Sequence, residues 1–392
     1  METLINCSNA ELKIITPDDG WHYFFAYYDM RATGKHGQNP YHLCHRVKFI
    51  DRIPTVEDVA EIGYLRDGAF VKIAETTAWN FQQGAMLQYH PFLDDTVYYN
   101  VCENGRFSTV THNFKTGEKQ YTDRATACIS PDGKWGIAIN FGRIFAFRPG
   151  YGYAGFVDEN ADVNAPSDDG VFLVNMETGK SELIASYEKM APISGLGEDK
   201  KVLVNHITFS PNSDRYVMLF RDFPVIVDGH MRWNTSLMVG DRSGNVHTVL
   251  PCGFASHYYW VNDEELLIYC RIEDQYGLYR INVLTGEWKL YEDEFFGDGS
   301  FIRDIHCSLS PDGNYIIGDS YPINDYRELV AYSLRSNTLR TIAKSYRPVD
   351  IRDDFRCDLH ARFVWDGRGI SFDTVHDHKR QIALLSIDAL NF

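Results

Sequence analysis

The sequence predicts an all-β protein, a seven-bladed β-propeller of four-stranded antiparallel blades that occupies residues 1–392 as a single domain. Three observations predict it: one kind of hairpin turn recurs along the chain, its copies are spaced by about 50 residues, and four histidines occupy the same place in the repeat. A repeat architecture also explains how so long a chain folds as one domain, since each repeat packs mainly on its neighbours.

The recurring turn joins two short strands. Each copy has a strand, a turn rich in Pro, Asp, Asn or Gly, and a second strand of β-branched and aromatic residues. Proline presets φ and glycine supplies positive φ, which makes this turn chemistry typical of hairpins. Four copies align without gaps: HITFSPNSDRYVMLF from His206, HYYWVNDEELLIYC from His257, HCSLSPDGNYIIGDS from His306 and HARFVWDGRGISFD from His360. A fifth copy begins at Cys128, and a weaker sixth begins at Gln88.

A second, outer hairpin follows the inner one, as after Gly170, Gly277 and Glu328, so each repeat has four strands. The four aligned histidines are 51, 49 and 54 residues apart. Counting outward predicts seven repeats that begin near residues 20, 80, 123, 200, 251, 300 and 355. The last repeat has only three strands, so we expect residues 11–16 to supply the fourth and close the ring. Residues 150–170 are expected to form a loop insertion, and the chain as a whole is expected to contain almost no helix.

Composition limits the possible partners. The formal net charge of −16 disfavours nucleic acid and anionic membranes as partners. The eight cysteines form no CxxC pair, and no basic segment followed by an apolar core stands at the N-terminus. No apolar run approaches the roughly 18 residues of a membrane span. We therefore expect reduced cysteines and a cytoplasmic location, with a periplasmic or secreted location as the alternative if a leader precedes this sequence.

The four aligned histidines indicate a metal site. Each precedes the residue aligned with the turn proline by five positions, so the same register should bring all four towards one central site. Neutral imidazoles suit a divalent ion such as Zn²⁺ or Mn²⁺. The predicted ligands are His257, His306 and His360, with His206 and Cys357 as further candidates. A thiolate from Cys357 would favour zinc. A repeated histidine retained for packing is the alternative explanation.

Arginines near these histidines provide local positive charge. Arg221 ends the strand that follows His206, and Arg356 and Arg362 flank His360. The planar guanidinium pairs bidentately with carboxylates. An acidic ligand is therefore compatible with the negative net charge, although surface ion pairs explain such arginines equally, Arg356 more readily than Arg221.

Several segments together resemble the β-propeller polysaccharide lyases, a group that includes ulvan lyases and, more distantly, oligogalacturonate lyases. The resemblance covers most of the chain, and its implied substrate is an acidic oligo- or polysaccharide. It implies β-elimination at a uronic acid: an arginine, sometimes with a metal, neutralises the carboxylate, and a His or Tyr removes the C5 proton. The segments are HYFFAYYDM (22–30), WNFQQGAMLQYHP (79–91), NFGRIFAFRPGYGYAG (140–155), ASHYYW (255–260) and RCDLHARFVWDGRGISFDTVHDHKRQIALL (356–385).

The resemblance also implies roles for individual residues. Arg221 is the expected neutraliser, and His206 and Tyr258 are the expected base and acid. His90 and His112 resemble a histidine pair of ulvan lyases, although His112 fits an outer strand equally well. The expected substrate contacts are Tyr28, Arg143 and Arg362.

Two other functions fit the same residues. One is a non-catalytic propeller that binds a carbohydrate or a protein partner and holds a structural metal. The other is a glycoside hydrolase, which requires a pair of carboxylates. Asp29, Asp304 and Asp358 are the candidates for that pair, but no spacing singles out two of them.

Overall fold

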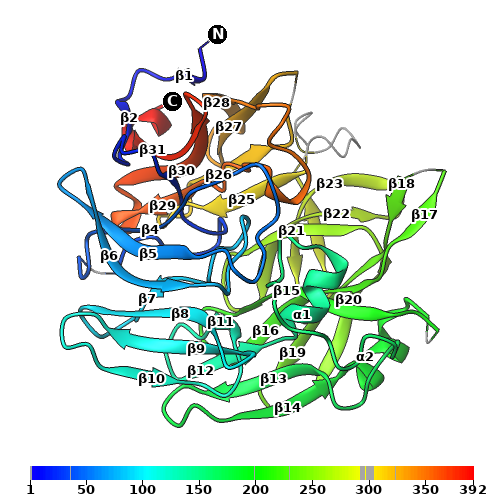
Figure 1. Cartoon of the computed structure of the whole chain (residues 1–392). Coiled ribbons are helices and arrows are strands. Elements are labelled where there is room, and N and C mark those ends of the chain that lie inside the picture. The colour runs from blue at the N-terminus through cyan, green and yellow to red at the C-terminus, as the bar shows by residue number, and fades with distance from the viewer. Residues whose placement is uncertain are drawn as a thin grey trace. The chain divides into compact units, whose positions relative to one another are not determined.

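The chain is a seven-bladed β-propeller of mainly antiparallel, four-stranded blades, as predicted (Figure 1). The computed structural model describes residues 2–35, 37–197, 199–228, 230–291, 296, 304–322 and 324–392. Within these residues the strands form seven sheets of four or five strands and one separate two-stranded ribbon. No described helix is long and apolar enough to cross a membrane.

The blades follow one another in chain order, and their first strands begin close to the predicted starts of the repeats. Blade 1 has β3 (His22–Phe24), β4 (His42–Val47), β5 (Ala60–Arg66) and β6 (Ala69–Thr76). Blade 2 has β7 (Gln88–Tyr89), β8 (Thr96–Glu103), β9 (Arg106–Asn113) and β10 (Lys119–Tyr121). Blade 3 has β11 (Thr126–Ile129), β12 (Trp135–Ala138), β13 (Gly170–Asn175) and β14 (Ser181–Ser186). Blade 4 has β15 (Val202–Phe209), β16 (Arg215–Asp222), β19 (Thr235–Asp241) and β20 (Val246–Gly253).

The remaining blades complete the series. Blade 5 has β21 (Ala255–Trp260), β22 (Glu265–Ile272), β23 (Gln275–Asn282) and β24 (Trp288–Leu290). Blade 6 has β25 (Ile305–Leu309), β26 (Tyr315–Ser320), β27 (Tyr326–Ser333) and β28 (Thr338–Tyr346). Blade 7 has β29 (Arg362–Val364), β30 (Gly369–His376) and β31 (Lys379–Ser386). The separate ribbon has β17 (Val225–Val227) and β18 (His230–Arg232).

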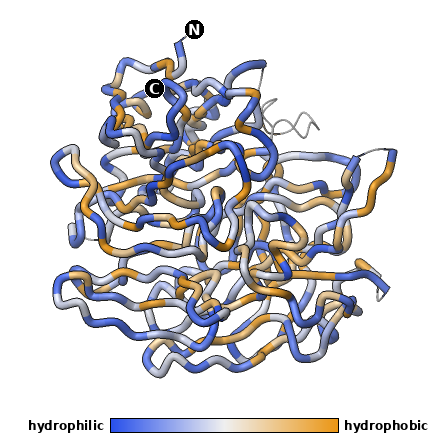
Figure 2. The backbone as a smooth tube through the Cα atoms, viewed as in Figure 1, coloured by the Kyte–Doolittle hydropathy of each residue, from blue (hydrophilic) through white to orange (hydrophobic). Residues whose placement is uncertain are grey.

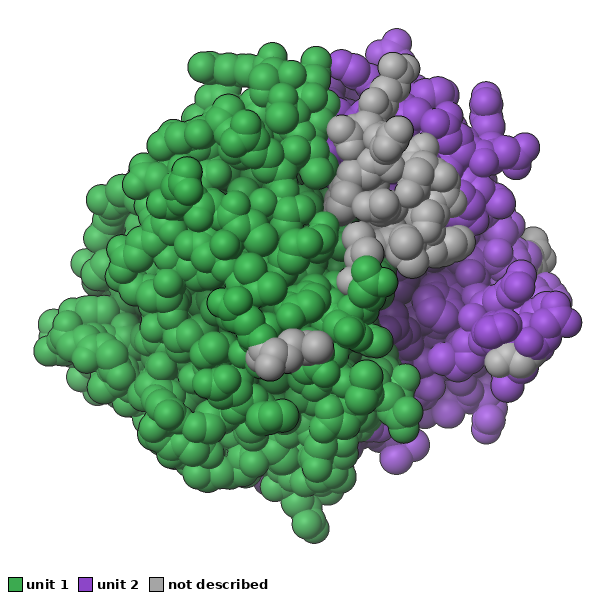
Figure 3. Space-filling view, turned by 90° about the horizontal axis from the view of Figure 1, so that it is seen from above, with its two compact units in different colours: residues 1–99, 111–119, 301–392 green, residues 100–110, 120–300 purple. Residues whose placement is uncertain are grey.

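The chain divides into two compact units, coloured separately in Figure 3. Unit 1 comprises residues 1–99, 111–119 and 301–392, and unit 2 comprises residues 100–110 and 120–300. Unit 1 therefore contains blades 1, 6 and 7, unit 2 contains blades 3, 4 and 5, and the residues of blade 2 are divided. The single-domain organisation stays a prediction.

Two short strands at the N-terminus complete the sheets near the C-terminus (Figure 1). Strand β2 (Leu12–Ile14) pairs with β31, with Leu12 opposite Leu385 and Ile14 opposite Ala383. This pairing supplies the fourth strand of blade 7, as predicted, and covers an otherwise exposed sheet edge. Strand β1 (Leu4–Asn6) pairs with β28 as a fifth strand of blade 6, which was not predicted.

The recurring turn has the predicted geometry. In two copies the glycine N–H donates to the carbonyl of the serine three residues earlier, at 2.8 Å for both Gly133 and Gly313. Their φ angles are +70° and +71°, the region that glycine adopts without strain. Figure 2 shows apolar residues gathered along the strands and hydrophilic ones at such turns.

Residues 150–169 form a loop without helix or strand, as predicted, and a short helix that was not predicted precedes this loop. Helix α1 (Phe141–Phe147) begins after Asn140, whose side chain accepts a hydrogen bond from the Arg143 N–H at 2.9 Å. A second short helix, α2 (Tyr187–Ser194), ends at Gly195 in the left-handed conformation.

Candidate functional site

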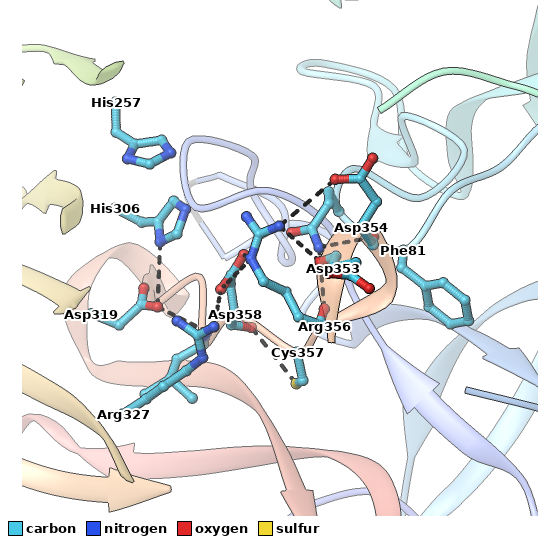
Figure 4. A network of polar contacts seen from close by, with 12 residues as sticks. Phe81, His257, His306, Asp319, Arg327, Asp353, Asp354, Arg356, Cys357 and Asp358 are labelled. Carbon is cyan, nitrogen blue, oxygen red and sulfur yellow. Dashed lines mark hydrogen bonds and ion pairs between the residues drawn. The ribbon is translucent and has the colours of Figure 1, made fainter. Parts of the chain in front are cut away.

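Three buried side chains gather in unit 1: His306, Asp358 and His360. One possible metal-ligand atom from each lies within 4.8 Å of the other two. The imidazole centroids of His306 and His360 are 4.5 Å apart and the rings are nearly perpendicular, at 86°. Figure 4 shows His306 and Asp358 from close by, with the polar groups around them.

These side chains come from two neighbouring elements of the chain's C-terminal part. His306 is the second residue of β25, where it pairs with Asp319 of β26. Asp358 and His360 lie in the irregular segment before β29. His360 has a φ of +43°, a left-handed conformation that is strained for a residue with a side chain. The Leu359 N–H, between the two ligand candidates, donates to an Asp319 carboxylate oxygen at 2.9 Å and helps to hold this conformation.

The ring of His306 is oriented by a carboxylate. Its Nδ1 lies 3.3 Å from Asp319 Oδ2, and both side chains are buried. Histidines that bind metals usually make such a contact through the second ring nitrogen, which fixes the tautomer and the ring orientation. The His306–Asp319 pair therefore has the form of a metal ligand with its supporting carboxylate.

Asp358 lies between two arginines (Figure 4). Arg327 Nη2 and Arg356 Nε are each 2.8 Å from one of its carboxylate oxygens. Burial alone would raise the pKa of Asp358, but Arg327 and Arg356 hold that pKa well below its usual range. Asp358 is therefore ionised at neutral pH, the form in which a carboxylate binds a cation.

His360 is held in its neutral form. Burial, followed by the neighbouring His306, lowers the pKa of His360 well below its usual range. Its Nε2 has no hydrogen-bond partner among the residues that the structure describes. A buried nitrogen lone pair without a partner is costly, and a metal ion would satisfy it. Two imidazoles and an ionised carboxylate thus fit a divalent transition metal.

Aromatic rings cover the histidine pair. The ring centroid of Tyr27 is 4.7 Å from that of His360, and the centroid of Tyr28 is 5.5 Å from that of His306. Tyr27 and Tyr28 therefore lie beside the candidate metal-binding group, which is the set His306, Asp358 and His360. Tyr28 is buried there, and its role in binding substrate stays a prediction.

Arg362, a predicted substrate contact, has structural partners. It is 2% exposed, its Nη2 donates to Asp373 at 2.7 Å, and its Nη1 donates to the Ala26 carbonyl at 3.4 Å. The same Asp373 carboxylate accepts a hydrogen bond from the Phe25 N–H. Arg362 thus helps to hold the segment that carries the two tyrosines.

The metal-binding group differs in part from the predicted ligand set. His306 and His360 were predicted, whereas Asp358 was considered only as a glycosidase carboxylate. Cys357 lies outside the group: its thiol donates to the Asp358 carbonyl at 3.7 Å, and burial raises its pKa to about 11. His257, on β21 in unit 2, is also outside the group, and its role as a ligand stays a prediction.

Unit 2 brings two of the predicted catalytic side chains together. The rings of His206, on β15, and Tyr258, on β21, are stacked with centroids 4.5 Å apart. The Tyr258 hydroxyl donates to the Val217 carbonyl at 3.2 Å and accepts from Thr208 Oγ1 at 3.3 Å. The Tyr258 hydroxyl therefore already has two hydrogen-bond partners in blade 4. The catalytic roles of His206 and Tyr258 stay predictions.

In unit 2 the strand pairing is irregular next to two of the aligned histidines, His206 and His257. The β15–β16 pairing shifts register between Val204 and His206, and the β21–β22 pairing shifts between Ala255 and Tyr258, on either side of His257. Such bulges re-aim side chains and are frequent next to active sites. Arg221, near the end of β16, donates from Nη1 to Asn205 Oδ1, in the first of these bulges, at 2.6 Å.

The other predicted residues have structural partners. His90 Nδ1 accepts hydrogen bonds from the Phe92 and Leu93 N–H groups, at 3.1 and 3.0 Å, and thereby caps a turn. His112 Nδ1 is 3.2 Å from the Tyr99 hydroxyl. Within the described residues no hydrogen bond or ring contact joins the two histidines.

Arg143, the third predicted substrate contact, is fully buried in helix α1. It uses all five of its N–H groups within unit 2, on one carboxylate and four carbonyl oxygens. The acceptors are Asp158 and the carbonyls of Asn160, Val163, Asn164 and Val202. Arg143 therefore fastens the insertion to β15, which is a structural role, and its role as a substrate contact stays a prediction.

Comparison with known proteins supports the fold. No protein family model and no curated protein sequence matches this chain. Among solved structures, an oligogalacturonate lyase in complex with manganese has a TM-score of 0.66 and 14% identity, over 98% of this chain and 95% of that one. An oligogalacturonate lyase from Vibrio parahaemolyticus has a TM-score of 0.66 and 15% identity, over 98% and 96%. The tricorn protease has a TM-score of 0.51 and 12% identity, over 94% of this chain and 34% of that one.

At these identities the likeness establishes the fold and no more. The chain therefore shares the propeller fold of oligogalacturonate lyases, while the resemblance to ulvan lyases stays a prediction.

Proposed function

We propose that this protein is a metal-assisted lyase that cleaves a glycosidic bond at a uronic acid by β-elimination. The observation that carries the proposal is the buried group of His306, Asp358 and His360. Its support is the shared fold with oligogalacturonate lyases, one of them in complex with manganese.

His306, Asp358 and His360 would hold the metal. When bound, a divalent ion supplies positive charge that polarises the uronate carboxylate and makes the proton on the adjacent carbon more acidic. Without a thiolate in the group, the earlier reason to favour zinc is lost, and a set of two imidazoles and one carboxylate suits Mn²⁺ as well as Zn²⁺.

The remaining roles are the ones that the resemblance to polysaccharide lyases implies. Arg221 is assigned to pair with the uronate carboxylate, because its planar guanidinium matches carboxylate geometry. His206 is assigned to remove the C5 proton. The C4–O bond then breaks, a double bond forms between C4 and C5, and the leaving oxygen takes up a proton. Because the Tyr258 hydroxyl is already hydrogen-bonded within the blades, His206 is the better candidate for proton transfer.

The second candidate function is a carbohydrate-binding propeller with a structural metal. Arg327 and Arg356 favour this second function, because their ion pairs with Asp358 occupy the carboxylate that would otherwise face a substrate. In a glycoside hydrolase Asp358 would fit only the ionised carboxylate that acts as nucleophile or base, because the general acid must carry a proton and Asp358 is held ionised.

The deciding experiment is incubation of the Mn²⁺- or Zn²⁺-loaded protein with a panel of uronate-containing polymers and oligomers. The panel includes galacturonate oligomers, polygalacturonate and ulvan. Only β-elimination creates a conjugated double bond, which is followed by ultraviolet absorbance. New reducing ends without that absorbance would indicate hydrolysis, and binding without cleavage would favour the carbohydrate-binding function.

A further inference from the structure

Residues of blades 1 and 2 form a concave site within unit 1. It is a pocket of about 420 Å³ that shares no residue with the metal-binding group. This volume lies in the range of ligand pockets, roughly 300–1,000 Å³. Four aromatic and two acidic residues stand in its lining: Tyr41, Tyr64, Tyr89, Phe114, Asp94 and Asp95.

The walls of the pocket are fastened to one another. Asn39 Oδ1 accepts a hydrogen bond from the Asp95 N–H at 3.0 Å, and Asn39 Nδ2 donates to the Leu93 carbonyl at 3.5 Å. The Tyr89 hydroxyl donates to the Tyr41 carbonyl at 3.1 Å. These contacts join the loop before β4 to the loop before β8, so the chain's own hydrogen bonds hold the walls of the pocket together. A preformed site loses less entropy when a ligand binds.

His90 contributes to the same wall. By accepting from the N–H groups of Phe92 and Leu93, its Nδ1 shapes the turn that leads to Asp94 and Asp95. Burial lowers the pKa of His90, which keeps the ring neutral and able to accept both hydrogen bonds. His90, which the resemblance to ulvan lyases made a candidate catalytic residue, thus shapes a loop of this pocket.

The aromatic rings pack against one another as a row. Tyr41 and Tyr64 are stacked with centroids 5.1 Å apart at 22°, and Tyr64 and Phe114 are 5.6 Å apart at 42°. The Arg66 guanidinium lies 5.8 Å over the ring of Tyr41. Because Tyr64 and Arg66 lie against Tyr41, and Tyr41 and Phe114 lie against Tyr64, these two tyrosines offer a ligand mainly ring edges and phenol hydroxyls. A cage for an organic cation requires open faces, so this geometry is unsuited to one.

The two acidic side chains of the pocket, Asp94 and Asp95, indicate the charge of the ligand that it can bind. Asp94 is exposed and forms no ion pair among the described residues, whereas Asp95 Oδ2 lies 3.5 Å from Lys115 Nζ. Carboxylates and phenols are good partners for sugar hydroxyls, but the charge of Asp94 would repel a uronate. We propose that this pocket is a second carbohydrate site that binds a neutral saccharide. The proposal goes beyond the lyase activity and does not depend on it.

The test is isothermal titration of the full chain with neutral disaccharides, namely cellobiose, xylobiose, lactose and β-1,4-galactobiose, and with digalacturonate. At least one neutral disaccharide should bind, and Tyr64→Ala should weaken that binding by about tenfold or more. Asp94→Asn should weaken the neutral ligand and reduce the discrimination against digalacturonate. Asp350→Asn, an exposed carboxylate outside the pocket lining, is the matched control and should change neither affinity.

Two results would contradict the proposed saccharide site. No neutral disaccharide binding to the folded protein would overturn it, as would binding that Tyr64→Ala and Asp94→Asn leave unchanged. Thermal unfolding of each variant establishes that the fold survives. His360→Ala separates the two proposals, since it removes a metal ligand and should leave the binding of neutral disaccharides intact even if no lyase activity is found.

Discussion

The Arg380 guanidinium donates from Nη2 to the main-chain carbonyl of Arg356 at 2.7 Å, from a side chain that is 1% exposed. Gln82 Nε2 donates to the same carbonyl at 3.1 Å. No carboxylate lies within ion-pair distance of Arg380 among the described residues. Burying an unpaired charge is costly, yet here it fixes the main chain two residues before Asp358. The polypeptide around the candidate metal ligands is thus held by side chains from distant parts of the sequence.

Arg380→Met should therefore weaken metal binding, because the methionine fills similar space but cannot hold the Arg356 carbonyl. Loss of such supporting interactions typically costs about 10–100-fold in metal affinity. Titration with Mn²⁺ measures the affinity, and denaturant unfolding of the metal-free protein measures stability separately. Arg352→Met, at an exposed arginine, is the control. An unchanged Mn²⁺ affinity in a destabilised Arg380→Met protein would leave Arg380 with a purely structural role.

Substitution of any one residue of the candidate metal-binding group should abolish or strongly weaken metal binding. We expect His306→Ala, His360→Ala and Asp358→Asn each to lower Mn²⁺ or Zn²⁺ content strongly, measured by elemental analysis after dialysis against the ion. His257→Ala tests the third predicted histidine ligand directly, since loss of metal would make His257 a ligand and retention would exclude it. If wild-type protein holds no stoichiometric metal after dialysis against either Mn²⁺ or Zn²⁺, only packing or proton transfer remains as a role for these histidines.

The fold was predictable from the sequence because a single turn chemistry recurs. The turns ending at Gly133 and Gly313 require positive φ at one position, and that requirement is visible in the residues themselves. Helix α1 was missed because it depends on one local cap, Asn140, within a segment rich in glycine and aromatic residues. Strand β1 was missed because three residues carry too little periodicity to predict a strand.

Two of the three residues of the candidate site were predicted from the sequence as metal ligands. His306 and His360 stood out because they repeat, whereas Asp358 stands two residues before His360 and has no counterpart in every repeat: the same position holds Val204 and Ala255. The pair of arginines on Asp358 is a tertiary arrangement, since Arg327 comes from another blade. A carboxylate two residues from a candidate ligand is the signal that could have found it.

The pH dependence of stability should reveal a buried histidine in blade 1. His45 Nδ1 lies 2.7 Å from the Phe25 carbonyl, and its Nε2 accepts from the Ala85 N–H at 3.0 Å, so the ring is neutral. Burial lowers its pKa from 6.5 to about 4. The unfolded chain binds this proton more readily, so the stabilisation is complete above pH 6.5 and is lost as the pH falls towards 4. The loss is on the order of 3 kcal/mol.

Denaturant unfolding across this pH range measures the effect. His45→Gln should lower stability at neutral pH and flatten its fall between pH 6.5 and 4. His42, whose pKa burial lowers to about 3, adds a similar dependence that the His45 variant retains. An unchanged slope in His45→Gln would show that other groups produce the acid sensitivity.

Gly84→Ala should destabilise the protein through the same histidine. A Cβ at position 84 would lie 2.3 Å from His45 Cε1, and the glycine has a φ of +61°. Both the clash and the backbone conformation oppose a side chain. We expect a loss of about 2 kcal/mol or more in the free energy of unfolding. Gly105→Ala is the control, because its φ is similarly positive but no atom lies within 4 Å of the added Cβ.

The catalytic assignment is tested by two substitutions in unit 2. Arg221→Lys keeps the charge but loses the planar fork, so kcat on a cleaved uronate substrate should fall by about a hundredfold, or on the order of 3 kcal/mol. Arg215→Lys, at the start of the same strand, is the matched control and should retain normal turnover. His206→Ala should be at least as damaging if His206 is the base, with a pH–rate profile altered differently from that of the arginine variant.

Two further measurements make the outcome of these substitutions decisive. Metal content should stay normal in both variants, because neither residue belongs to the metal-binding group. Thermal unfolding must also be followed, because Arg221 holds Asn205 and His206 stacks on Tyr258, so either change can loosen the blades. If both variants fold, bind metal and still cleave substrate at nearly the normal rate, the base and the neutralising arginine lie elsewhere in the chain.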